Sequence, residues 1–82
     1  MYRIYTEDVN RELIEQIVAD SFDGYTLLPA TGVWKGAREQ SVVIELSTED
    51  KARVFETARQ IKAANKQEAV LVDYVADEAV LV

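Results

Sequence analysis

The chain has 82 residues, which is enough for one hydrophobic core and one domain spanning residues 1–82. Its 49% hydrophobic and 29% charged residues are typical of a folded globular protein. It has no cysteine and no histidine, which excludes disulfides, thiolate catalysis and histidine-dependent bases or metal ligands. The net charge of −6 argues against a broad nucleic-acid-binding surface.

Membrane insertion and secretion are not expected. No apolar run approaches the ~20 residues that a membrane-spanning helix requires. The chain opens on a strand-like segment rather than on the charged and apolar regions of a secretory leader. We therefore expect a cytoplasmic protein that does not contact membranes.

The first two predicted elements are a strand and a helix. Residues 2–6 alternate β-forming side chains and predict a strand. Over residues 9–21 apolar side chains recur at three- and four-residue spacing, which predicts an amphipathic helix. Asp8 or Asn10 is suited to cap its start, and Gly24 to end it.

A predicted β-hairpin follows. Residues 25–34 are rich in β-branched and aromatic side chains and predict a strand. Pro29 within them indicates an edge strand or a bulge, because proline cannot donate to a ladder. Residues 35–40 predict a polar connection and residues 41–47 a third strand, and the short link favours a hairpin.

The last third predicts a second helix and a fourth strand. The helix begins near Ser47 or Thr48, either of which is suited to cap it, and Asn65 is a suitable stop. Residues 68–75 predict the fourth strand. The tail, residues 78–82, is mostly apolar and predicts a short extra strand that adds to a neighbour's sheet edge.

The predicted order β-α-β-β-α-β is that of an α+β, ferredoxin-like sandwich. We expect a four-stranded antiparallel sheet with two helices on one face, plus the short C-terminal extra strand. Helix-length crossovers favour parallel pairing of strand 1 with strand 3 and of strand 4 with strand 2. The expected spatial order of the strands is 4-1-3-2.

The face of the sheet that the helices leave open carries apolar side chains, among them Tyr5 and Val43. A solvated sheet face is normally more polar, so a second subunit is expected to cover it. The alternative is that scattered exposed valine and tyrosine side chains are ordinary. We expect a homo-oligomer.

The paired carboxylates do not predict catalysis. Three acidic pairs occur, all at the ends of predicted elements, where capping and solubility explain them: Glu7-Asp8, Glu49-Asp50 and Asp77-Glu78. Neither the spacing of an EF-hand nor a phosphate-binding glycine motif is present. We therefore expect no enzyme, no metal site and no cofactor.

One segment is distinctly less acidic than the rest. The fifteen positions from 24 to 38 contain no acid, yet hold all three glycines and the only tryptophan. Glycine allows a ligand to approach the backbone closely, cations attract an anion, and an aromatic ring stacks on a base. The candidate ligand-binding residues are Gly32, Trp34, Lys35, Gly36 and Arg38. The alternative is a hairpin in which the glycines serve turns and Trp34 packs on a neighbour.

The runs Thr-Gly-Val-Trp-Lys-Gly (31–36) and Ser-Val-Val-Ile-Glu-Leu (41–46) resemble the second and third strands of the PII/CutA superfamily. This resemblance implies a trimer of ferredoxin-like units with small-molecule sites in the clefts between subunits. In PII relatives those sites hold adenine nucleotides, and the resemblance carries over to the five candidate residues. The chain differs in its short link in place of the PII T-loop, and in lacking a glycine- and lysine-rich loop at residues 64–68.

The sequence therefore predicts a PII/CutA-like homotrimer that binds a nucleotide or other small anionic ligand, in a regulatory or sequestering role rather than a catalytic one. The alternative is a protein-interaction module that docks a partner through its hairpin or sheet edge. A third reading is a small enzyme that uses carboxylates.

Overall fold

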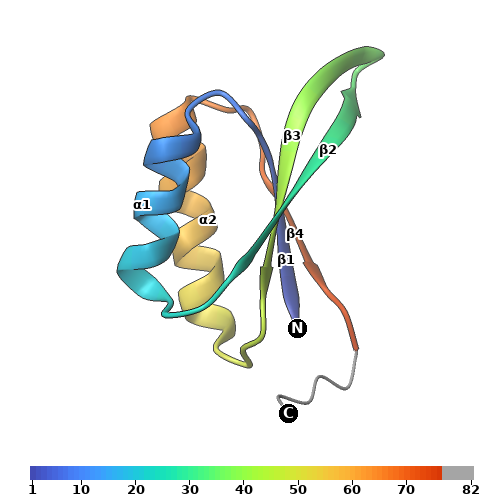
Figure 1. Cartoon of the computed structure of the whole chain (residues 1–82). Helices are drawn as coiled ribbons and strands as arrows, with labels where there is room; N and C mark the ends of the chain where they lie inside the picture. Colours follow the sequence, from blue (N-terminus) through green and yellow to red (C-terminus); the bar gives the residue numbers. More distant parts are fainter. Residues whose placement is uncertain (77–82) are drawn as a thin grey trace.

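The computed structural model describes residues 1–76 (Figure 1). Its elements, in chain order, are β1 (Tyr2–Glu7), α1 (Arg11–Ser21), β2 (Thr26–Trp34), β3 (Ala37–Leu46), α2 (Lys51–Asn65) and β4 (Leu71–Tyr74). The predicted α+β class and the order β-α-β-β-α-β are confirmed. The expected extra strand at residues 78–82 lies outside the described residues.

The four strands form one antiparallel sheet in the order β2-β3-β1-β4, which is the predicted spatial order read from the other side. The predicted parallel pairing is wrong: β1 pairs antiparallel with both β3 and β4, and β2 pairs antiparallel with β3. Each helix does join two strands that run in the same direction. Those strands are separated in the sheet, however, because β3 lies between β1 and β2, and β1 lies between β3 and β4.

Side-chain caps set the helix boundaries. The Asn10 side chain accepts the backbone N–H of Leu13 at 3.3 Å, so α1 begins at Arg11. Asp50, rather than Ser47 or Thr48, caps α2, because its carboxylate accepts a backbone N–H of the first turn. α2 ends at the predicted stop, Asn65, and Lys66 follows it in the left-handed conformation.

Both helices cover the same face of the sheet, and the core lies between this face and the helices (Figure 1). It consists of alternate residues of β1 and β3 together with one stripe of each helix. Its fully buried members include Ile4, Ile14, Val18, Val42, Ile44, Val54 and Ile61. Period-two burial in the strands and helical-period burial in the helices therefore meet in a single core. No helix within residues 1–76 is long and apolar enough to cross a membrane.

The face of the sheet away from the helices carries one continuous apolar row. The register pairs Leu28 with Val43, Val43 with Tyr5, and Tyr5 with Leu71, so the row crosses all four strands. Leu28 and Leu71, at its two ends, are 42% and 62% exposed. Two residues along β1 on the same face, the next row is charged, with Arg3 and Glu45 in an ion pair of 2.8 Å. We call Leu28, Val43, Tyr5 and Leu71 the open-face row.

Candidate functional site

The candidate residues lie at the end of the β2–β3 hairpin. β3 begins at Ala37, so most of the predicted polar connection, residues 35–40, is in fact strand. Trp34 pairs directly with Ala37, which leaves only Lys35 and Gly36 in the turn. Both have positive φ, 50° and 80°. A two-residue turn whose twist matches that of its flanking strands requires such angles at both positions. The role of Gly36 is therefore conformational.

The hairpin end extends beyond the rest of the sheet. β1 pairs with β3 only as far as Glu7 and Ser41, and one further backbone bond joins the Asp8 N–H to the Gln40 carbonyl at 2.9 Å. From there β2 and β3 continue as a two-stranded ribbon, which projects above the helical layer in Figure 1. Its side chains are consequently accessible on both faces.

Gly32 is explained by packing within this ribbon. A Cβ atom on Gly32 would lie 2.6 Å from the Ser41 hydroxyl oxygen and 3.3 Å from Cγ of Glu39. Any larger residue would have to displace the neighbouring strand's side chains. Gly32 thus allows the side chains of the two strands to approach closely across the hairpin.

Trp34 and Lys35 converge on one carboxylate, that of Glu68 in the loop between α2 and β4. The Trp34 indole Nε1–H donates to one carboxylate oxygen at 3.3 Å, and the Lys35 ammonium donates to the other at 2.9 Å. The ammonium also lies 5.9 Å from the centre of the indole ring. Two donors from the hairpin therefore hold a carboxylate between them, at a solvent-exposed position.

These two donors lower the pKa of Glu68 below the usual value for glutamate. The hydrogen bond from Lys35 is the larger cause and the hydrogen bond from Trp34 the second, while partial desolvation opposes them. Both donors favour the charged form of the carboxylate. The hairpin end is thus a local environment that stabilises an anion.

The loop that carries Glu68 is fixed by the end of α2. Lys66 ends α2 in the left-handed conformation, and the backbone N–H of Gln67 then donates to the Lys62 carbonyl at 3.0 Å. The buried Thr6 hydroxyl and the Asn65 amide both donate to the Gln67 side-chain oxygen. These bonds tie the loop to β1 and bring Glu68 beside the hairpin.

Arg38 does not join this group. It pairs with Val33, one step from the Trp34–Ala37 pair, and successive side chains of a strand project to opposite faces. Arg38 and Trp34 therefore project from opposite faces of the hairpin. Of the five predicted residues, the structure brings Trp34 and Lys35 together, gives Gly32 a packing role and Gly36 a role in the turn conformation, and places Arg38 on the opposite face.

Sequence reasoning missed Glu68. It lies 33 positions from Lys35 in an unremarkable polar loop, and no local motif marks it. Two carboxylates of the described acidic pairs have structural roles, of which the capping by Asp50 is the predicted one. Asp50 caps α2, and Asp8 forms an ion pair with Arg11 at 2.7 Å. The third pair, Asp77-Glu78, lies outside the described residues.

Comparison with known proteins gives no assignment: no family model matches the chain, and no curated protein matches it.

Proposed function

We propose that this protein is a non-catalytic, self-associating protein that binds a nucleotide or another small anionic ligand beside Trp34 and Lys35, in a cleft between subunits. The observation that carries the proposal is the Glu68 carboxylate, held by the Trp34 N–H and the Lys35 ammonium. A ligand carboxylate or phosphate offers the same acceptor atoms, and the exposed indole ring supplies a stacking surface. The resemblance to PII/CutA proteins points to the same part of the chain.

Self-association is supported by the open-face row. Val43 is only 8% exposed, but Leu28 and Leu71 leave about half of their surfaces in contact with water. A continuous apolar row across four strands is a feature that a second copy of the chain would cover. A trimer is the arrangement that the resemblance implies. We further propose that the mostly apolar tail, residues 78–82, adds a strand to a neighbouring subunit's sheet.

A protein-interaction module is the second candidate. The hairpin projects from the sheet as a two-stranded ribbon (Figure 1), and Trp34 and Val33 on its two faces are 49% and 65% exposed. β4 also leaves one edge without a strand partner among residues 1–76. In this case the hairpin or the β4 edge would dock a protein partner instead of a small ligand.

The deciding experiment is thermal stabilisation of the full chain across nucleoside mono-, di- and triphosphates, cyclic nucleotides and dicarboxylates. A specific ligand raises the melting temperature with its concentration, by mass action. Because Trp34 is the only tryptophan, the same ligand should change the intrinsic fluorescence. If no compound of the panel shifts either signal, the ligand-binding proposal is wrong and the interaction module is favoured.

The matched variants are Lys35→Asn and Arg38→Gln. Each removes one positive charge from the hairpin, and asparagine tolerates the positive φ of position 35. Lys35→Asn is expected to weaken binding at least tenfold, because it removes a charge-assisted hydrogen bond. Arg38→Gln, on the opposite face, is expected to leave the affinity within about twofold. The reverse result would move the ligand to the other face of the hairpin.

A further inference from the structure

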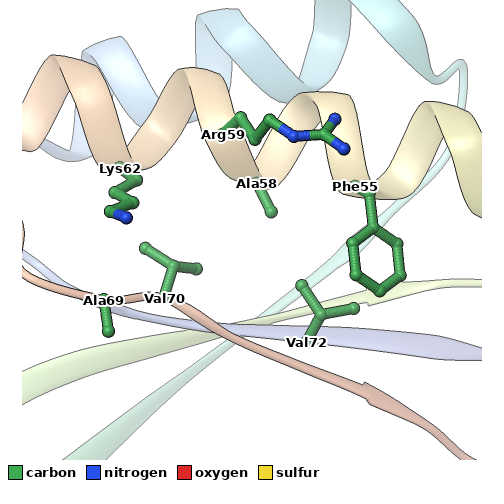
Figure 2. Close-up of a pocket in the computed structure, with 7 residues that line it drawn as sticks. All are labelled: Phe55, Ala58, Arg59, Lys62, Ala69, Val70 and Val72. Atoms are coloured by element: carbon green, nitrogen blue, oxygen red, sulfur yellow. The ribbon is translucent and has the colours of Figure 1, made fainter.

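A concave region lies on the helical side of the sheet, between α2 and β4 (Figure 2). It is an open groove of about 290 Å³. Its floor and walls are apolar side chains, namely Phe55 and Ala58 of α2 with Val70 and Val72 of the segment that ends in β4. The Trp34–Lys35 pair belongs to the projecting hairpin, so the two sites share no residue.

The groove exists because α2 does not fully cover the β4 side of the sheet. Phe55, Val70 and Val72 are only partly buried, although all three pack against the core. Between them α2 presents Ala58, whose side chain is too short to reach across the gap. Apolar surface is therefore left in contact with water along the β4 side of the molecule.

The rim of the groove is cationic. Arg59 and Lys62 both line it from α2, and none of its described lining residues is acidic. In Figure 2 Lys62 extends towards Val70, and Arg59 runs along the helix towards Phe55. Arg59 also pairs with Glu56 at 3.1 Å, so Lys62 is the less neutralised of the two. In a chain of net charge −6, this arrangement selects a negative group.

We propose that this groove binds an amphipathic monoanion, a molecule with one carboxylate and an unbranched apolar body. The carboxylate would lie by Lys62, at the Val70 end of the groove, and the apolar body along Ala58 and Val72 towards Phe55. Phe55 and Lys62 are seven residues apart on α2, which corresponds to about 10 Å along the helix axis. That length suits a medium-chain carboxylate better than acetate, and the apolar floor disfavours a polar dianion.

The test uses octanoate, below the concentration at which it forms micelles, with the full-length protein labelled for amide NMR. Octanoate is expected to shift the amides of residues 55–62 and 69–72 in a saturable way and to leave those of 34–36 in place. Acetate and octanol are the controls for the apolar body and for the charge. Both are expected to bind at least tenfold more weakly.

Three variants separate this site from the hairpin site. Arg59→Gln combined with Lys62→Gln is expected to weaken octanoate binding about tenfold, while Lys35→Asn leaves it unchanged. Ala58→Leu should fill the groove and abolish the shifts, with circular dichroism confirming the fold. If it does not fold, the charge variant decides alone.

The proposal is overturned if octanoate and octanol bind equally, or if the Gln variant binds octanoate like the wild type. It is also overturned if the groove amides respond only to protein concentration, because a second copy would then occupy the groove. None of these outcomes affects the hairpin proposal, which is tested with different ligands and variants.

Discussion

The open-face row gives the sharpest test of self-association, through the double variant Leu28→Glu/Leu71→Glu. Both side chains lie at the ends of the row, on the face that the helices do not cover. They are 42% and 62% exposed, so replacing them removes little buried apolar surface from the isolated chain. Substitutions at such surface positions change the free energy of unfolding by about 0.5 kcal/mol or less.

In an assembled protein the same change makes the free energy of association less favourable. Fully burying a leucine side chain is worth about 2 kcal/mol, so covering the exposed parts of both is worth about 2 kcal/mol per subunit. Losing this alone weakens association about 30-fold. Each glutamate would in addition be desolvated without a partner, which costs further free energy. We therefore expect the variant to be monomeric at micromolar concentration.

Light scattering coupled to size exclusion measures the mass of the wild type and the variant. The matched control is Val9→Glu/Val33→Glu, which adds the same two charges at apolar side chains that are 55% and 65% exposed but lie outside the row. The wild type and the control are expected to have the trimer mass, and the row variant the monomer mass. A wild type that is monomeric, or a row variant that keeps the wild-type mass, would refute the reasoning.

Three further predictions follow from local features. Gly36→Ala places a Cβ at a φ of 80° and should destabilise the protein by about 1 kcal/mol, which urea denaturation would show as a lower midpoint. The control Gly24→Ala, at a position with open space around it, should leave the midpoint unchanged. The pKa of Glu68 is lowered in the folded state, so its interaction with Trp34 is present at neutral pH and is lost as the pH falls through that lowered pKa. Trp34 fluorescence should report this transition, and Glu68→Gln should abolish it. Deleting residues 79–82 should weaken assembly, and an unchanged mass and melting temperature would show that the tail takes no part.

The fold was largely predictable because its signals are local. The alternation of residues 2–6 and the helical stripes depend only on the backbone repeat, which every segment carries with it. Pro29 correctly indicated an edge strand, since β2 lies at the edge of the sheet. The predicted strand order is confirmed, but the parallel pairing from which it was argued is wrong. A helical crossover indicates which strands run in the same direction, and not which strands lie side by side.

The candidate site was only half predictable for the same reason. The sequence placed Trp34, Lys35 and Gly36 at the hairpin end, where turn chemistry is local. It could not fix the turn length, and a two-residue turn sets a register that turns Arg38 to the opposite face from Trp34.

Only the tertiary structure brought Glu68 to the hairpin, through a helix end and a loop held by Thr6 and Asn65. That meeting depends on where α2 ends in space relative to β2 and β3. Residue periodicity determines which side chains share a face, but the packing of whole elements determines which distant side chains meet.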